Sequence, residues 1–194
     1  MNHDPEKCTK CYIDIDLAGI WNQKEGKNPR LVLSRMGYVI NYHNLLIIWA
    51  RLLYTRIVLI TMEAEYISIY QAIRDVLPFV SLMKKIESVL KLQGDTLTVL
   101  CSIFENPVTV YEENQGAVAL TVSLQMLPCK KHIMINYHHL QIFVVNSDVE
   151  IKHVDTKEHI ADIFTKPLDS EFFIYLPYKI NGWWVHGILL HKEF

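Results

Sequence analysis

The sequence lacks an excess of charge of either sign: 19 basic and 21 acidic residues give a formal charge of -2 over 194 residues. A bulk positive field that would attract nucleic acid or an anionic membrane is therefore missing, and any such contact has to come from local patches. The first ten residues also lack the apolar run of a secretory signal. We therefore expect an intracellular protein, cytoplasmic or nuclear, with reduced cysteines.

The four cysteines lack the spacing of a structural metal site. Cys8 and Cys11 form one Cys-x-x-Cys pair without a second matching pair, and Cys101 and Cys129 stand alone. Because structural zinc is usually held by four ligands, isolated thiols are favoured over a zinc site.

The chain also lacks an uninterrupted apolar run long enough for a membrane span. Tyr42–Ile60 is the nearest approach, but Arg51 and Arg56 fall near its centre. Each would cost roughly 2.5 to 3.5 kcal/mol there, so we expect no membrane partner. What is present is a 51% hydrophobic composition, which at this length predicts one domain with a large core.

The stretch from Cys11 to Gly19 reads as a strand with one apolar and one acidic face. Strand side chains alternate between faces, and a carboxylate among buried apolar groups is costly unless it is hydrogen-bonded, paired or bound to metal. Two interpretations remain open: a sheet with one wet face, or a metal-binding strand. The apolar face has Cys11, Ile13, Ile15 and Leu17, and the other has Tyr12, Asp14 and Asp16.

A hairpin and a long helix follow. The turn is expected at Asn41–Asn44, and a further strand at Tyr54–Ile60. Apolar residues at helical spacing predict a helix from Thr61, bent or interrupted at Pro78. Glu65 falls within or beside the buried stripe of this helix, where it is either an acid that interacts with the helix dipole or part of a site.

Three later segments carry the other acids of interest. Glu113 lies where a short strand runs into a helix, at the kind of strand end where ligands collect in α/β sheets. The pair Lys130 and Lys131 opens another helix. After a last short strand, Asp155 resembles the cap of the helix that contains Asp162.

These segments resemble the ribonuclease H domain that ends the Pol polyprotein of copia-type LTR retrotransposons. The resemblance runs from about Cys11 to Leu168 and is most specific in its last motif. The similar stretches are Tyr12-Ile-Asp-Ile-Asp-Leu-Ala-Gly19, Gly37-Tyr-Val, Ile48-Trp-Ala50, Thr61-Met-Glu-Ala-Glu-Tyr-Ile67, Val110-Tyr-Glu-Glu-Asn-Gln-Gly-Ala117, Lys131-His-Ile and Ile151-Lys-His-Val-Asp-Thr-Lys-Glu-His-Ile-Ala-Asp-Ile-Phe-Thr-Lys-Pro-Leu168.

The resemblance implies an α/β ribonuclease H-like fold, a five-stranded mixed sheet of order 3-2-1-4-5 flanked by helices. It implies that residues 11–168 form the domain, after a polar leader at 1–10 and before a tail at 169–194 without family match. It also implies an acidic tetrad that holds two Mg²⁺ ions, with Mn²⁺ as a substitute, made of Asp14, Glu65, Glu113 and Asp162.

The implied reaction is hydrolysis of the RNA strand of an RNA–DNA hybrid. Helix shape and 2′-hydroxyl groups would select the hybrid, so no small-molecule substrate is expected. The candidates for substrate contact are Asn114, Gln115, Lys130 and Lys131. A reverse transcriptase domain or the rest of a polyprotein is the other expected partner.

The sequence departs from the family pattern at three places. Glu113 replaces the usual aspartate, Leu17 the usual tryptophan, and the Arg51–Arg56 connection lacks the usual Ser-Lys followed by Gln. An added methylene at Glu113 displaces a carboxylate by about 1 Å, and a misplacement of that size can cost on the order of 100-fold in rate. Weakened activity is expected. The alternatives are a catalytically dead module that binds nucleic acid or a reverse transcriptase, and a decayed remnant without function.

Overall fold

The computed structural model describes residues 9–17, 33–42, 44–54, 61–92, 107–122 and 131–181. Its centre is a five-stranded sheet of order β3-β2-β1-β4-β5, as predicted. Neighbouring strands β1, β2 and β3 are antiparallel, whereas β4 and β5 run parallel to β1. The strands are β1 Thr9–Asp16, β2 Arg35–Tyr42, β3 Leu45–Leu53, β4 Val108–Glu112 and β5 Val149–His153.

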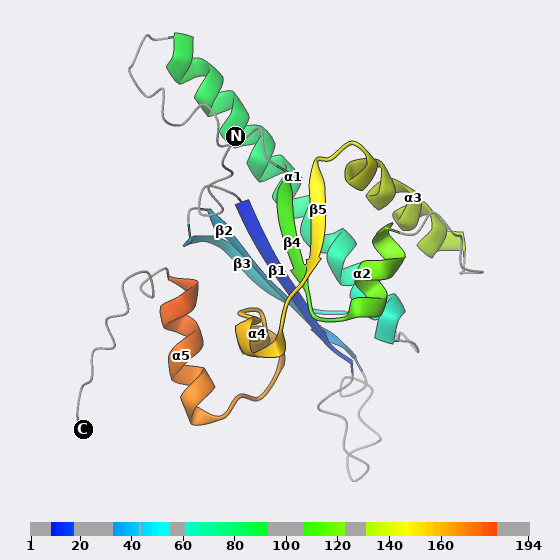
Figure 1. The fold of residues 1–194 in the computed structure, drawn as a ribbon, viewed down its shortest axis with the longest axis vertical. Helices are drawn as coiled ribbons and strands as arrows, with labels where there is room; N and C mark the ends of the chain where they lie inside the picture. The colour runs from blue at the N-terminus through cyan, green and yellow to red at the C-terminus, as the bar shows by residue number, and fades with distance from the viewer. Residues whose placement is uncertain are drawn as a thin grey trace.

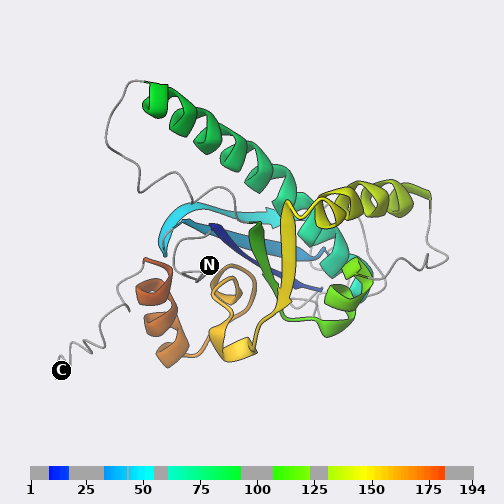
Figure 2. The same ribbon diagram turned by 45° about the horizontal axis from the view of Figure 1, so that its top comes forward.

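Helices cover both faces of this sheet (Figures 1 and 2). The first three, α1, α2 and α3, lie on one face, and the short α4 lies with α5 on the other. We call these the α1 face and the α4 face. The helices are α1 Thr61–Leu92, α2 Gln115–Val122, α3 Lys131–Val145, α4 Asp162–Thr165 and α5 Ser170–Ile180, with a 3-10 turn η3 at Thr156–Glu158.

The main core lies on the α1 face. Strand alternation turns Cys11, Ile13 and Ile15 of β1 toward α1, and all three are buried. The first half of α1 meets them with a stripe of buried residues at helical spacing. That stripe consists of Ala64, Tyr66, Ile69, Ala72, Ile73, Val76 and Val80.

A smaller core covers the α4 face. Val39 of β2 packs there with Ile160 and with Leu176 and Ile180 of α5. The face of β1 that carries Asp14 is therefore not open to water, and Asp14 itself is only 3% exposed. This burial excludes the first interpretation of the strand, a sheet face open to water, at Asp14.

The predicted hairpin is confirmed as the antiparallel pair of β2 and β3. Asn44 takes a positive φ of 60° in its turn, a conformation that asparagine tolerates better than most residues. The strand predicted after it falls mostly outside the described residues: β3 ends at Leu53, and positions 55–60 are not described. At Pro78 the chain makes one continuous helix, since α1 runs through it.

The segment after Leu168 is helical as far as Ile180. Asp169 caps α5 by accepting a hydrogen bond from the Phe172 backbone N–H at 2.9 Å. Leu176 and Ile180 then pack into the smaller core. Thr9 and Lys10 already belong to β1, and residues 1–8 and 182–194 lie outside the described part, so the domain limits stay a prediction. None of the described helices is long and apolar enough to cross a membrane.

Candidate metal centre

Asp14 is brought against α4 because the strand beside it lacks a side chain at the matching position. Its partner on β2 is Gly37. A Cβ at Gly37 would lie 2.7 Å from Cβ of Phe164, closer than atoms can approach, so glycine lets α4 pack directly on the sheet. The Thr165 hydroxyl of α4 donates a hydrogen bond to Oδ2 of Asp14.

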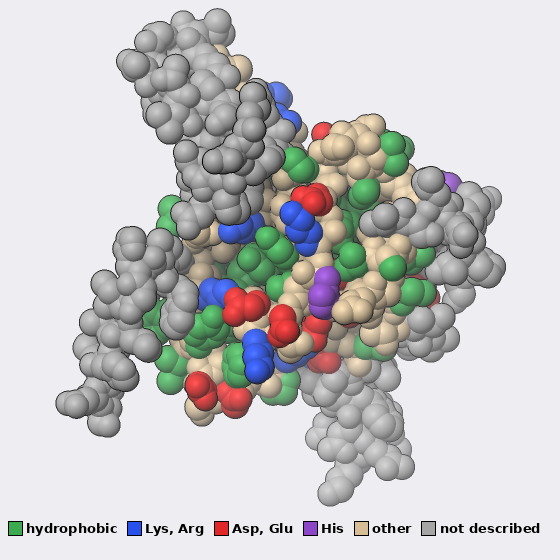
Figure 3. All heavy atoms as spheres, in the orientation of Figure 1, with side chains coloured by type: hydrophobic (Ala, Val, Ile, Leu, Met, Phe, Trp, Pro, Cys, Tyr) green, Lys and Arg blue, Asp and Glu red, His purple; other side chains and the backbone are tan. Residues whose placement is uncertain are grey.

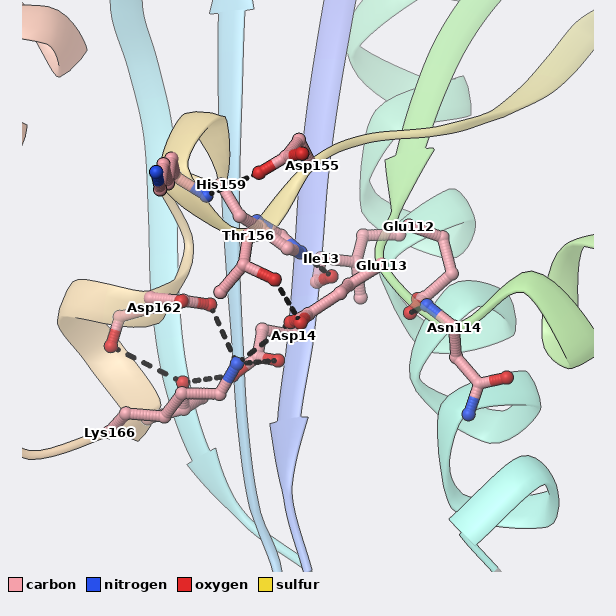
Figure 4. A network of polar contacts seen from close by, with 12 residues as sticks. Ile13, Asp14, Glu112, Glu113, Asn114, Asp155, Thr156, His159, Asp162 and Lys166 are labelled. Atoms are coloured by element: carbon pink, nitrogen blue, oxygen red, sulfur yellow. Dashed lines mark hydrogen bonds and ion pairs between the residues drawn. The ribbon is translucent and has the colours of Figure 1, made fainter.

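Three of the four predicted acids meet at one lysine. The Lys166 ammonium lies 3.2 Å from Oδ1 of Asp14, 3.0 Å from Oε2 of Glu113 and 3.0 Å from Oδ1 of Asp162 (Figure 4). The three carboxylates come from β1, from the residue after β4 and from α4. Glu113 is held further by the Thr156 hydroxyl, which donates to its Oε1 at 2.5 Å.

Burial and the shared lysine shift the protonation of this group in different directions. Burial, with the charge of Asp14, raises the pKa of Asp162 to about 6. Burial alone would also raise the pKa of Glu113, but the hydrogen bonds from Thr156 and Lys166 hold it below its usual value. Burial alone would lower the pKa of Lys166. The carboxylates of Asp14, Glu113 and Asp162 raise this pKa instead, so the ammonium stays charged.

Glu65, the fourth predicted acid, lies on the α1 face in the second turn of α1. It is 7% exposed, and its Oε2 is buried without a hydrogen-bond partner among the described residues. Burial raises its pKa to about 9, and the charges of Glu112, Asp14 and Glu113 add to the effect in that region. Glu65 therefore shares the electrostatic neighbourhood of the other three acids but is not bonded to Lys166.

A fifth acid, Glu112, lies in the same neighbourhood and was not predicted. It is 1% exposed; its Oε1 accepts a hydrogen bond from the Asn114 backbone N–H at 3.0 Å, and its Oε2 has no partner in the described structure. Burial raises its pKa to about 8. The alternation of β4 could have revealed it, because Glu112 follows Val108 and Val110 on the buried face.

His159 is the other residue that the sequence did not single out. Its side chain is fully buried, and Nε2 lies 2.8 Å from the carbonyl oxygen of Ile13. Since a carbonyl only accepts, we assign the hydrogen to Nε2; Nδ1 has no partner among the described groups. Burial lowers its pKa, so the ring is neutral and can offer a lone pair.

Asp14, His159 and Asp162 form a group that can bind a metal ion. Each is buried, and each offers one ligand atom within 4.8 Å of the others. The spacing of His159 and Asp162, three positions apart, was the signal available in the sequence. Imidazole nitrogen and carboxylate oxygen are both common ligands of divalent metals.

The residues predicted to contact substrate are less clearly placed. Asn114 accepts a hydrogen bond from the Ala117 backbone N–H at 3.1 Å and so caps α2. Gln115 is exposed as the first residue of α2. Lys131 begins α3, while Lys130 lies outside the described residues. Contact with substrate stays a prediction for all four.

The chain is similar in sequence to Pol polyproteins from plant transposons. No protein-family model matches the chain. The Retrovirus-related Pol polyprotein from transposon RE1 of Arabidopsis thaliana is 30% identical over 170 residues, covering 88% of this chain and 10% of the relative. That from transposon TNT 1-94 of Nicotiana tabacum is 25% identical over 165 residues, covering 84% and 11%. The chain thus spans about a tenth of the length of these curated relatives.

Among solved structures, the chain resembles the N-terminal RNase H domain of Rv2228c from Mycobacterium tuberculosis, solved as a fusion with maltose-binding protein. The TM-score is 0.50 at 12% identity, over 81% of this chain and 90% of that one. At this identity the likeness concerns the fold alone. Together with the relatives and the strand order, it identifies the chain as a distant homologue of one region of the Pol polyproteins of copia-type retrotransposons, with a ribonuclease H-like fold.

Proposed function

We propose that the chain is a Pol-derived ribonuclease H domain that hydrolyses the RNA strand of RNA–DNA hybrids with the help of Mg²⁺, and that its activity is weakened. The observation that carries the proposal is the meeting of Asp14, Glu113 and Asp162 around one cationic group. Acids from three separate elements gather in this way only where positive charge is to be held, because their mutual repulsion is otherwise unfavourable.

The residues present fit a divalent cation. Carboxylate oxygens are the ligands that Mg²⁺ prefers, and Mn²⁺ also accepts the imidazole nitrogen that His159 offers. The buried Oε2 of Glu65 and Nδ1 of His159 lack partners in the described structure, although such groups are usually paired. Asp14, Glu65, Glu113 and Asp162 would hold the metal, with His159 as a further donor. When bound, two such ions would activate a water, stabilise the leaving 3′-oxygen and neutralise the phosphate between them.

The chain's own residues keep this site in shape before any metal binds. Thr165 fixes Oδ2 of Asp14, and Thr156 fixes Oε1 of Glu113. His159 ties η3 to β1 through the Ile13 carbonyl. Because Lys166 balances part of the acidic charge, the carboxylates can lie close together without metal.

Hybrid recognition would depend on local contacts. On the face drawn in Figure 3, acidic and basic side chains are intermixed, and no broad field of positive charge is seen among the described residues. Asn114, Gln115, Lys130 and Lys131 remain our candidates for substrate contact. Backbone and 2′-hydroxyl contacts suit a hybrid read by shape, so base sequence should matter little.

A second candidate function is a catalytically dead module that still binds nucleic acid or a reverse transcriptase. The ion pairs of Lys166 favour it, since its ammonium is bonded to three carboxylates that a metal would need. The small share of the relatives that the chain covers is consistent with a domain that works beside others of a polyprotein.

The test is cleavage of a labelled RNA–DNA hybrid by the purified protein, with and without Mg²⁺, beside an Asp14→Asn control. We expect Mg²⁺-dependent cleavage that Asp14→Asn lowers by about 100-fold or more, equivalent to about 3 kcal/mol of lost transition-state stabilisation. Millimolar Mg²⁺ should also raise the melting temperature, because a ligand that binds only the folded state stabilises it. A folded protein that cleaves nothing but melts higher with Mg²⁺ would favour the dead module.

A further inference from the structure

Two consecutive glutamates at the end of β4 point to opposite faces of the sheet. Glu113 reaches Thr156 and Lys166 on the α4 face. Glu112 points away from them, toward the turn that leads into α2 (Figure 4). By strand alternation Glu112 shares the α1 face with Val108 and Val110, both of which are buried. Glu112 therefore lies on the α1 face of the sheet and Glu113 on the α4 face.

The first two turns of α1 lie against the segment that follows Glu112. A Cβ at Gly116 would be 3.8 Å from Sδ of Met62, so the beginnings of α1 and α2 are in contact. Glu65 is one helical turn after Met62. This packing brings Glu65 to the end of β4, where Glu112 is the charged side chain that acts on it most strongly.

Glu65 and Glu112 each have one buried oxygen that no group in the described part of the chain satisfies. The Oε2 atoms of both residues lack a hydrogen-bond partner among the described groups, and the side chains are 7% and 1% exposed. A buried carboxylate oxygen without a partner is costly, and native structures rarely keep one without a reason such as a bound ion. Lys166 does not satisfy these oxygens, since it is bonded to Asp14, Glu113 and Asp162 instead.

The net charge of the whole cluster indicates which kind of ligand suits it. Five carboxylates and one ammonium interact in this cluster, so the fully ionised cluster has four more negative than positive charges. The acids are Asp14, Glu65, Glu112, Glu113 and Asp162, and the ammonium is that of Lys166.

We propose that Glu112 is a fifth carboxylate of the metal centre and that, with Glu65, it holds a divalent cation on the α1 face, with Asp14 between the two halves. Two divalent cations would balance the four excess negative charges, whereas Lys166 by itself balances only one of the five carboxylates. The inference rests on the proposed metal-dependent function for the identity of the ion, but not on cleavage of any hybrid.

The experiment is equilibrium binding of Mn²⁺ to the purified chain, followed by electron paramagnetic resonance of the free ion. Glu112→Gln is the main variant: its amide oxygen can still accept from the Asn114 N–H, while the charge is lost. We expect Glu112→Gln to weaken one class of Mn²⁺ site by at least about tenfold, the loss typical of changes around metal ligands. Glu150→Gln, at an exposed glutamate of β5 paired with Lys152, should bind like the parent chain.

A double variant separates a shared site from two unrelated effects. If Glu65 and Glu112 hold the same ion, Glu65→Gln combined with Glu112→Gln should lose little more than either change alone. Glu112→Asp keeps the charge on a shorter arm and should bind more tightly than Glu112→Gln, provided circular dichroism shows both folded.

The outcomes distinguish this inference from the proposed function. A parent chain that binds no Mn²⁺ overturns both. A parent chain that binds Mn²⁺, with Glu112→Gln equal to it in stoichiometry and affinity, overturns only the role of Glu112. In that case Glu65 and Glu112 are a buried pair that shares a proton.

Discussion

The two faces of the sheet balance their acidic residues in opposite ways. On the α4 face, Asp14, Glu113 and Asp162 share the Lys166 ammonium, and hydroxyl groups satisfy further oxygens. On the α1 face, Glu65 and Glu112 have no ion-pair partner among the described residues. The chain itself neutralises part of the acidic charge on the α4 face, whereas the acids of the α1 face depend on a proton or a cation from solvent.

Glu112 and Glu113 show the difference between the two faces directly, because they are adjacent in the sequence and of the same residue type. Glu113, 32% exposed and bonded to Thr156 and Lys166, has a lowered pKa. The pKa of Glu112, 1% exposed, is raised to about 8 by burial. Position in the fold, not residue type, therefore decides which acid is charged at neutral pH.

The largest effect is expected from shortening Glu113, one of the acids on the α4 face. We predict that Glu113→Asp raises hybrid cleavage in Mg²⁺ by roughly 10- to 100-fold, the range that correcting a displacement of up to about 1 Å can supply. The longer arm is what lets Glu113 reach both Thr156 and Lys166, so the aspartate should also be freer to serve a metal. Cleavage rates on one hybrid measure the change.

Two comparisons control this experiment. The gain should be smaller in Mn²⁺, which tolerates distorted geometry better than Mg²⁺ does. Glu113→Gln, which removes the charge, should gain nothing. If Glu113→Asp is folded but inert in both metals, the defect lies elsewhere, and the Arg51–Arg56 connection becomes the first place to look.

Four acids of the centre, from both faces of the sheet, were predicted from the sequence, whereas Glu112 and His159 were not. Asp14, Glu113 and Asp162 stand in motifs whose spacing is informative, and the strand order followed from the same motifs. The role of Gly37 could not be read in advance, because it depends on α4 packing across the sheet from a segment more than 120 positions away.

Glu112 and His159 show why the rest was missed. Each is an ordinary polar residue in its motif, and only tertiary packing buries it completely or almost so. The helix expected from Asp155 onward is also divided, into η3 and a four-residue α4, because His159 turns inward to the Ile13 carbonyl. Local propensity does not contain such a long-range contact.

Raising the pH tests the protonation of Glu65 and Glu112, the two buried acids of the α1 face. The folded pKa values of Glu65 and Glu112, about 9 and about 8, lie above the ordinary 4.5. Between these limits the folded state binds more protons than the unfolded state, so stability falls as pH rises. We expect the metal-free protein to lose on the order of 4 kcal/mol of unfolding free energy from pH 7 to pH 9, measured by urea denaturation.

Glu65 and Glu112 account for most of the change in this window; the buried Cys11 thiol, whose pKa burial raises, adds a smaller decrease of the same sign because it ionises only in the unfolded chain. Asp162, with a pKa of about 6, and His159, with a lowered pKa, have already titrated at pH 7, and Lys166 titrates above pH 9. Glu112→Gln should remove part of the slope, and Mg²⁺ should reduce it by stabilising the charged forms. A metal-free protein whose stability is flat from pH 7 to pH 9 would contradict the assignment of these acids as protonated.

The smallest of these effects is expected from removing the lysine shared by the acids of the α4 face. Lys166→Met keeps the length of the side chain but leaves Asp14, Glu113 and Asp162 without an internal cation. The metal-free variant should melt lower than the parent at pH 8, because three close carboxylates then repel one another. Its affinity for Mn²⁺ should rise by about 3- to 10-fold, since the ammonium no longer competes for the same oxygens; the modest size reflects an ammonium that is about one third exposed. Mn²⁺ titration measures the affinity, with Lys152→Met, at the exposed pair with Glu150, as the control.

An unchanged or weaker affinity in Lys166→Met would contradict this competition. It would mean that the ammonium supports the metal site, and that the acids of both faces need the lysine and the metal ion together.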